Sequence, residues 1–288
     1  MKNMFSDTHF HYKMATRERG VNGKEVLEAL IARGTFFAQD IGTHCDDVQA
    51  RYEAIEEDIA SLDKDAQEKA HKMIHYSAGI WPAEEAIKER ETQVKRLEDE
   101  INAFEKRTGQ KVISLGECGL DHHWNSEHEA EFDSDMIAAE KEMFEMQLEL
   151  AKKLSLPVIV HSRDAASDTI DCIKRVGYDK GIIHCYSYGI EEARIFLDRG
   201  WYISFSGSIT YTKKRNMEDM RALLRFVPKE RLLLETDAPY LAPVPLRGSV
   251  NNPVNVSHTY QFCADMRLEK AEELSEAVDA NIRALYAL

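Results

Sequence analysis

The sequence predicts an α/β fold in which eight parallel strands form a distorted TIM barrel, followed by extra C-terminal helices. Its 288 residues suit one large barrel. Eight short apolar runs alternate along the chain with longer amphipathic segments. Successive strand–helix–strand units make right-handed crossovers, and eight strands joined in this way are typical of a closed barrel. An open doubly wound sheet is the alternative fold.

The expected strands are short and mostly bounded by Gly, Pro or polar residues. They cover residues 4–7, 35–41, 73–78, 112–116, 157–161, 181–184, 201–205 and 232–235. Helices are expected between them. In residues 135–154, for example, Ile137, Phe144 and Leu148 fall on one helical face. Two further helical segments follow the eighth strand.

Residues 45–72 make a long acidic connection after the second strand, and this connection looks like an insertion. We expect it to form an altered rim of the barrel or a contact between subunits. No internal repeat and no Pro- or Gly-rich linker interrupts the chain. Residues 1–288 are therefore expected to form a single domain.

The formal net charge of −14 comes from 37 Lys and Arg residues against 51 Asp and Glu residues. This excess of acid argues against a protein that coats nucleic acid by general electrostatic attraction. It does not exclude a nuclease, because bound metal ions reverse the local field of an acidic site.

The cysteines and the apolar runs indicate the cellular compartment. Five cysteines without a C-x-x-C pair favour reduced thiols over a disulfide framework. No apolar run reaches the length of a membrane span, and the first residues lack the apolar stretch of a secretory signal. We therefore expect a cytoplasmic protein that does not associate with membranes.

Side chains that ligate metals stand at the ends of five expected strands. They are His9 and His11, Glu117, His161, His184 and Asp237. In a parallel barrel these strand ends meet at the C-terminal face. Imidazole and carboxylate groups bind zinc, manganese and related divalent ions, and a carboxylate can bridge two of them. The sequence therefore predicts a divalent metal site on this face.

His9 and His11 are two residues apart, so on an extended chain both imidazoles point to the same side. An isolated pair of this kind is ordinarily two polar residues at a strand end. The four other donors at matching strand ends favour metal binding instead.

The motifs DTHFH, GECGLD, PVIVHSRDA, HCYSYG and LLLETDAPYLAP follow one another between Asp7 and Pro243. In this order they resemble the TatD-type deoxyribonucleases, a family of metal-dependent hydrolases with amidohydrolase-like barrels. The resemblance implies two divalent cations, with Mg, Mn and Zn all open. It implies that His9, His11 and Asp237 hold one cation, that His161 and His184 hold the other, and that Glu117 bridges them or sits between them.

The same resemblance implies a reaction. The substrate would be DNA, single-stranded or at 3′ ends, cleaved at phosphodiester bonds by a water that two metals activate. An exonuclease, which removes terminal nucleotides, is the expected type. Asp237 would act as general base, and Glu117 would also be catalytic. A small ester, amide or lactone, or an aminoacyl-tRNA, would suit the same site and remains the alternative. A non-catalytic binding protein is the third hypothesis.

Residues beside these motifs carry two interpretations each. Asp121 either orients a metal ligand or caps a loop. Arg163 either binds a substrate phosphate or pairs with Asp164 or Asp168. Trp81 stands where the family carries the histidine of G-x-H-P, so it either stacks on a base or narrows the pocket.

A basic triplet, Lys213, Lys214 and Arg215, follows the seventh strand. It either grips a nucleic-acid backbone or is solvated surface. His122 and His123 stand where the family more often carries aromatic residues, and we interpret them as surface or gap-filling histidines.

Overall fold

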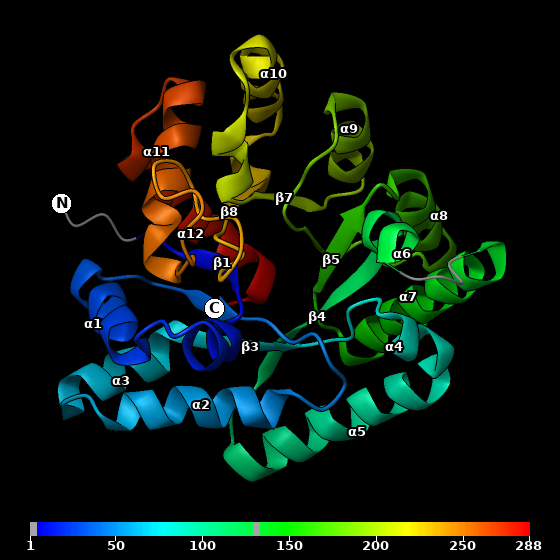
Figure 1. Ribbon diagram of the computed structural model, residues 1–288, viewed down its shortest axis with the longest axis horizontal. Coiled ribbons are helices and arrows are strands. Elements are labelled where there is room, and N and C mark those ends of the chain that lie inside the picture. The colour runs from blue at the N-terminus through cyan, green and yellow to red at the C-terminus, as the bar shows by residue number, and fades with distance from the viewer. Residues whose placement is uncertain (1–4, 129–132) are drawn as a thin grey trace. The chain divides into compact units, whose positions relative to one another are not determined.

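Eight parallel strands lie in chain order, β1 to β8, in one sheet with helices between them, so the predicted TIM barrel is confirmed (Figure 1). The computed structural model describes residues 5–128 and 133–288. Met4 of the first expected strand lies outside these residues. The chain divides into two compact units, and the single domain stays a prediction.

Unit 1 comprises Met1–Asp40, Ala50–His75 and Tyr202–Leu288. Its strands are β1 (Asp7–Phe10), β2 (Ala38–Asp40), β7 (Tyr202–Phe205) and β8 (Leu232–Leu234). Its α-helices are α1 (Gly23–Arg33), most of α2 (Val48–Ala60), α3 (Lys64–Met73), α10 (Met217–Phe226), α11 (Val256–Arg267) and α12 (Ala271–Tyr286). A π-helical turn, η1 (Met14–Glu18), and the 3-10 turns η2 (Gly207–Tyr211), η3 (Lys214–Asn216), η4 (Lys229–Arg231) and η5 (Pro253–Asn255) complete it.

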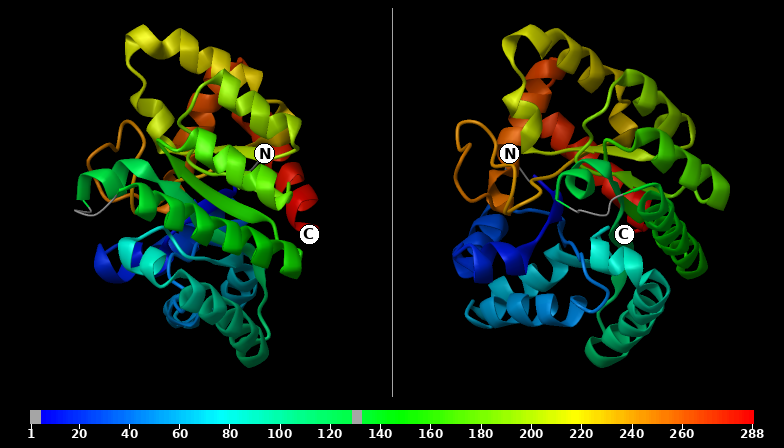
Figure 2. Two further views of the ribbon diagram at one scale, coloured as in Figure 1. Left: turned by 90° about the vertical axis from the view of Figure 1, so that its right-hand side faces the viewer. Right: turned by 45° about the vertical axis from the view of Figure 1, so that its right-hand side comes forward.

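Unit 2 comprises Ile41–Gln49 and Tyr76–Trp201. Its strands are β3 (Ile74–Ala78), which enters the unit at Tyr76, β4 (Val112–Asp121), β5 (Val158–Arg163) and β6 (Gly181–Ile183). Its helices are α4 (Glu84–Lys88), α5 (Arg90–Thr108), α6 (His122–His128), α7 (Ser134–Leu154), α8 (Ala166–Val176) and α9 (Ile190–Asp198). Helix α7 packs on β4, and the long helices α5 and α7 pack against each other (Figures 1 and 2).

The two C-terminal helices, α11 and α12, are those expected after the eighth strand, and both contact β8 within unit 1. In α12 the apolar face buries Leu274, Val278 and Ile282 completely. No helix within the described residues is both long and apolar enough to cross a membrane.

The expected insertion forms α2 and α3, and a buried ion pair and two further hydrogen bonds tie α2 to the rest of unit 1. Arg51 is buried and pairs with the buried carboxylate of Asp40, which also accepts a hydrogen bond of 2.8 Å from Tyr12 N. Asp58 of α2 accepts a hydrogen bond of 2.8 Å from Tyr12 Oη and one of 2.9 Å from Arg17. Removing one partner of a buried ion pair leaves an unpaired charge in a low-dielectric interior, which destabilises the fold. Residues 50–72 of the insertion are thus an integral part of unit 1, while the insertion's role as a rim or subunit contact stays a prediction.

The first, fourth and fifth strands extend beyond their expected ends, which corrects the sequence prediction. Strand β1 covers Asp7–Phe10 instead of ending at residue 7, so His9 lies within the strand. Strand β4 continues from Val112 to Asp121 instead of ending at residue 116, so Glu117 lies in its middle. Apolar runs mark the buried part of a strand, and they do not reveal pairing that continues through polar residues.

Glycine explains why β4 continues past its apolar run. Gly119 has φ +143° and pairs with His161 of β5. A Cβ at this position would lie 1.9 Å from the carbonyl oxygen of His161. Only a residue without a side chain allows β4 to approach β5 so closely.

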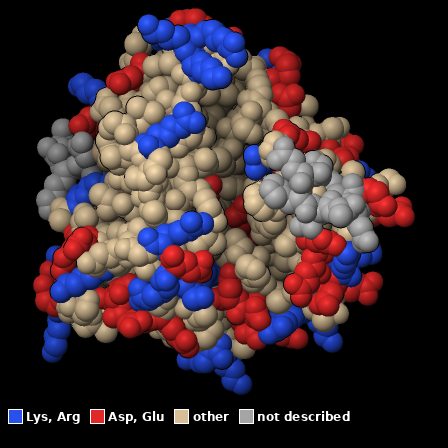
Figure 3. Space-filling model, viewed as in Figure 1, with Lys and Arg blue, Asp and Glu red and all other residues tan. Residues whose placement is uncertain are grey.

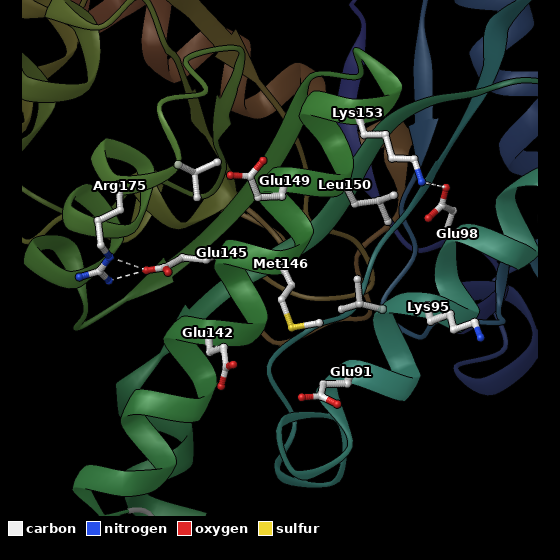
Figure 4. A pocket seen from close by; sticks show the side chains of 12 residues that line it. Glu91, Lys95, Glu98, Glu142, Glu145, Met146, Glu149, Leu150, Lys153 and Arg175 are labelled. Carbon is white, nitrogen blue, oxygen red and sulfur yellow. Dashed lines mark hydrogen bonds and ion pairs between the residues drawn. The ribbon is translucent and has the colours of Figure 1, made fainter.

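A groove of about 740 Å³ runs between α5, α7 and α8 of unit 2 (Figure 4). Ion pairs line it, because Lys153 reaches Glu98 at 2.5 Å and Arg175 reaches Glu145 at 2.7 Å. None of the predicted metal donors lines this groove. It is a charged helix-packing surface, and it does not contain the expected site.

We predict that Gly119→Ala destabilises the protein by about 2–4 kcal/mol, because the new Cβ clashes with main chain and strains the backbone. Urea unfolding followed by circular dichroism measures the change. Gly109→Ala is the matched control, since Gly109 also has positive φ, +73°, but nothing lies within 4 Å of its Cβ position. The control should lose only about 1 kcal/mol. Equal losses in the two variants would contradict the close approach of β4 to β5.

Candidate metal centre

The first donor cluster lies in unit 1, where β1 meets the segment after β8. His9 Nε2 lies 3.3 Å from His11 Nε2, and each of these atoms is 3.6 Å from Asp237 Oδ1. The convergence of the two imidazoles expected from their spacing is thus observed. Main-chain hydrogen bonds join the segments, from Asp237 N to His9 O at 2.9 Å and from His11 N to Ala238 O at 2.7 Å. The side chains of His9, His11 and Asp237 are 0%, 7% and 15% exposed.

Asp7 holds this cluster in place. Its buried carboxylate accepts hydrogen bonds from His9 N at 3.2 Å, Thr236 N at 3.0 Å and Thr236 Oγ1 at 2.6 Å. Burial raises the pKa of Asp7 to about 8, although these hydrogen bonds lower it. A divalent cation between the neighbouring imidazoles would favour the ionised carboxylate.

The second donor cluster lies in unit 2, within the neighbouring strands β4 and β5 and directly after β6. One Glu117 oxygen of β4 lies 2.9 Å from Nδ1 of His161 on β5 and 3.1 Å from Nε2 of His184, which follows β6. The two imidazole nitrogens are 3.3 Å apart. The exposed fractions of the His184 and Glu117 side chains are 3% and 6%. Three candidate ligand atoms therefore converge in a place that is largely closed to solvent.

Asp121 makes a contact suited to each of the two roles that the sequence left open. Its Oδ2 lies 2.9 Å from His161 Nε2, and its Oδ1 accepts a hydrogen bond of 2.6 Å from Trp124 N at the start of α6. A carboxylate on the outer nitrogen of an imidazole fixes the tautomer that presents the other nitrogen to a metal. Burial by itself lowers the pKa of His161, but the Asp121 and Glu117 carboxylates more than offset this and raise the pKa to about 9.

Glu140 of α7 is a functional neighbour that the sequence reasoning missed. It is completely buried and accepts hydrogen bonds from Asp121 N at 2.9 Å and Asn125 Nδ2 at 3.1 Å. Its second oxygen lies 3.2 Å from His122 Nε2, and this hydrogen bond raises the pKa of His122. His122 is therefore the partner of a buried carboxylate, which corrects its interpretation as a surface or gap-filling residue. A glutamate amid the polar face of a predicted helix carries no signal of this contact.

Both clusters fit a divalent cation by their donor set and spacing. Two ligand atoms bound to one ion at about 2.1 Å lie roughly 3.0–3.4 Å apart when they subtend 90–109°. The His9–His11 distance of 3.3 Å and the His161–His184 distance of 3.3 Å both fall in this range. Each pair of imidazoles is also joined by a carboxylate, as borderline and hard divalent ions prefer.

Two predicted substrate contacts lie beside the second cluster. The Trp81 ring meets the His161 ring edge-on, with 5.9 Å between centroids. Arg163 ends β5 and is exposed. Its two candidate partners are taken by other residues, since Asp164 pairs with His123 at 3.0 Å and Asp168 with Lys141 at 2.6 Å. Within the described residues Arg163 forms no ion pair, so its guanidinium is available to an anion.

The basic triplet Lys213, Lys214 and Arg215 is exposed on the surface of unit 1, in the turn η3 that leads into α10. Figure 3 shows Lys and Arg side chains gathered over α10, at the top of the view. The segment before the triplet contacts the segment after β8, because Tyr211 Oη donates to Ala242 O at 2.6 Å. In the part of the chain that the structure describes, no hydrogen bond or ion pair joins the triplet to the first donor cluster, so its proximity to that cluster stays a prediction.

Similarity to known proteins extends over nearly the whole chain. A family described as TatD-related DNase matches residues 6–287. An uncharacterised metal-dependent hydrolase of Bacillus subtilis, YabD, is 31% identical over 237 residues, which cover 80% of this chain and 86% of that protein. The protein named 3′-5′ ssDNA/RNA exonuclease TatD in Citrobacter koseri is 32% identical over 219 residues, covering 74% of this chain and 77% of that protein.

Among solved structures, the TatD homologue YJJV of Escherichia coli K12 superposes with a TM-score of 0.76. The match covers 100% of both chains at 24% sequence identity. This likeness supports the barrel fold.

We predict that a divalent cation displaces about one proton from the second cluster at pH 7.5, because His161 must give up its Nδ1 proton to become a ligand. A histidine whose pKa is raised from about 6.5 stabilises the metal-free fold below pH 6.5. That stabilisation is lost as the pH rises through about 9. Zinc titration calorimetry in buffers of different ionisation enthalpy measures the released proton.

Asp121→Asn should lower the pKa of His161 and reduce proton release at pH 7.5. For the unaltered protein, raising the pH to 9.5 should likewise reduce proton release. Asp171→Asn is the control, since Asp171 is an exposed carboxylate on α8. Proton release that is unchanged in Asp121→Asn would contradict the role given to this carboxylate.

Proposed function

This chain belongs to the TatD-related DNase family, whose model matches residues 6–287, and from this premise we propose that it is a deoxyribonuclease. It is a metal-dependent hydrolase that acts on ester bonds. The proposed substrate is single-stranded DNA, attacked at or near a 3′ end. The observation that carries the proposal is the pair of imidazole–imidazole distances of 3.3 Å, each beside a carboxylate.

In this proposal each cluster holds one divalent cation, Mg, Mn or Zn. His9, His11 and Asp237 bind the first, and His161 and His184 bind the second. Glu117 bridges the two cations or sits between them, as the family resemblance implies. Such ions, when bound, supply positive charge for the phosphoryl oxygens and lower the pKa of water.

The protein's own residues supply orientation and proton transfer. Asp237 accepts the proton of the attacking water, because it is an ionisable carboxylate at the cluster and its main chain is held by His9 O at 2.9 Å. Asp121 keeps His161 turned toward Glu117. Arg163 binds a phosphate of the substrate, and Trp81 contacts a base. These assignments rest on the exposed guanidinium and on the ring contact with His161.

A polymeric anion suits the surface better than a small neutral ester does. The chain is acidic overall, with a net charge of −14, yet exposed cations stand at Arg163 and at residues 213–215, and none of them forms an ion pair within the described residues. Local cations on an acidic protein favour binding where the substrate phosphates must lie. The Citrobacter koseri relative, named an ssDNA/RNA exonuclease, points to the same substrate class.

The test is hydrolysis of 5′-labelled single-stranded DNA by metal-free protein reloaded with Mg, Mn or Zn. Shortened products are expected, and Asp237→Asn should lose about 10²–10⁴-fold in rate, since an amide cannot accept the proton. Metal content is measured in the same samples, because Asn is also a poorer ligand. Hydrolysis of a small ester or an aminoacyl-tRNA, with intact DNA under every metal, would replace the proposed substrate by the alternative.

We expect Glu117→Ala to lower metal content by more than one equivalent and to abolish most activity, because one carboxylate would serve both ions. Inductively coupled plasma mass spectrometry counts the bound metal. Asp171→Ala removes an equal charge from an exposed site and should retain all of it. Two ions retained in Glu117→Ala with near-normal turnover would disprove the bridging role.

Replacing Lys213, Lys214 and Arg215 by Ala should raise KM for DNA and flatten its salt dependence by about 0.7 of a log–log unit for each lost phosphate contact. Hydrolysis of a small phosphodiester reporter should hardly change. The matched control replaces Lys64, Lys69 and Lys72, three exposed lysines of α3, and so removes the same charge. If the control has the same effect, the triplet contributes only general attraction. If both substrates suffer equally, the triplet supports the fold.

A further inference from the structure

An aromatic ring that the proposed reaction does not use stands at the first donor cluster. Tyr240 is 45% exposed, although it lies beside the buried side chains of His9 and His11. Its ring meets the His11 ring edge-on, with 6.5 Å between centroids and 73° between planes. Ligand sites are lined largely by apolar and aromatic side chains, so an exposed ring at this cluster suits a ligand contact.

The main chain fixes Tyr240 relative to Asp237. Tyr240 N donates a hydrogen bond of 2.9 Å to Asp237 O, which closes a turn between the two residues. The buried side chain of Asn251 donates to Tyr240 O at 2.7 Å and to Thr236 O at 3.1 Å. The ring is therefore carried by the same rigid turn as the carboxylate proposed as general base.

The hydroxyl end of the ring is held as well. Tyr240 Oη donates to Met14 Sδ at 3.0 Å, at the start of the π-helical turn η1. π-Helical turns are rare in proteins, and those that occur often lie at functional sites. Burial raises the pKa of Tyr240, and the nearby Arg19 guanidinium opposes that rise. Arg19 is exposed, and within the described residues it forms no ion pair with a carboxylate.

We propose that Tyr240 stacks on the nucleobase next to the scissile phosphodiester and that Arg19 pairs with a neighbouring phosphate. The inference rests on the proposed function and names how that site grips its substrate. A tyrosine ring offers its face to any base, so recognition tolerates different sequences. Arg19 beside the hydroxyl edge adds the cation that a backbone phosphate requires.

The ring's contribution is tested with Tyr240→Ala, Tyr240→Leu and Tyr240→Phe on single-stranded oligothymidylates. Matched oligonucleotides carry one abasic residue at each of the three 3′-terminal positions in turn. Tyr240→Ala should raise KM for the intact strand roughly 5- to 150-fold, with a smaller change in kcat, as expected for a lost stacking contact. Tyr240→Phe should remain close to the unaltered enzyme, and Tyr240→Leu should lie between.

The abasic strands distinguish stacking from structural support. For the strand that lacks the stacked base, the KM of the unaltered enzyme should rise to the value that Tyr240→Ala has for the intact strand. On that abasic strand, Tyr240→Ala should raise KM no further. Fluorescence anisotropy with labelled DNA gives the corresponding Kd, while melting temperature and metal content report on the fold. If Tyr240→Ala does not fold, Tyr240→Leu on the same strands decides the question.

Arg19→Ala should flatten the salt dependence of DNA binding by about 0.7 of a log–log unit. Lys24→Ala is the control, because Lys24 is an exposed cation of α1 and its loss changes the net charge equally. An equal effect of the two substitutions would overturn the phosphate contact.

The outcomes separate the two proposals. If the unaltered enzyme cleaves no oligonucleotide under any metal, the proposed function fails. If it cleaves DNA but Tyr240→Ala keeps its KM, or loses affinity equally for every abasic strand, stacking is wrong while the nuclease activity stands.

Discussion

Buried carboxylates that accept main-chain hydrogen bonds hold both donor clusters in place. Asp7 does this in unit 1, where it ties the amide of His9 to that of Thr236. Glu140 does it in unit 2, where it accepts the amide of Asp121. Both are completely buried, so each hydrogen bond acts in a low-dielectric place and leaving it unmade would be costly. Ligand geometry therefore depends on residues outside the proposed ligand set.

Carboxylates also determine how strongly the second cluster binds a proton. His161 stands between two carboxylates, and its pKa rises to about 9 although burial lowers it. A cation that enters the second cluster must therefore compete with a proton. We therefore expect cation binding at this cluster to weaken as the pH falls, at a position where the carboxylate of Asp121 also contacts the ring. Orientation and proton affinity are two consequences of one contact.

An acidic protein can bind an anionic substrate only at places on its surface where positive charge prevails. The exposed cations at Arg163, at Arg19 and around α10 provide such places on the surface, and bound cations would provide them at the clusters. The ion pair between α5 and α7 illustrates other parts of the surface, where acid and base neutralise each other. The distribution of charge is thus more informative than its sum.

The barrel was predictable because its signal is local and repeated. Each strand is an apolar run between turn residues, and each helix is an amphipathic segment, so an error in one element does not change the fold class. The strand ends were less predictable. Strand β4 runs on through Glu117 because Gly119 lets it approach β5, and this approach depends on another segment of the chain.

Residue type, periodicity and the order of motifs sufficed for the fold class, the six candidate donors and the family, because these are properties of neighbouring residues. The groups that surround the donors emerged only from packing. Glu140 of α7 meets Asp121 of β4, and Tyr240 meets Met14 across 226 residues of chain. Such contacts have no local signal, because packing brings together segments whose spacing in sequence places no restriction on their distance in space.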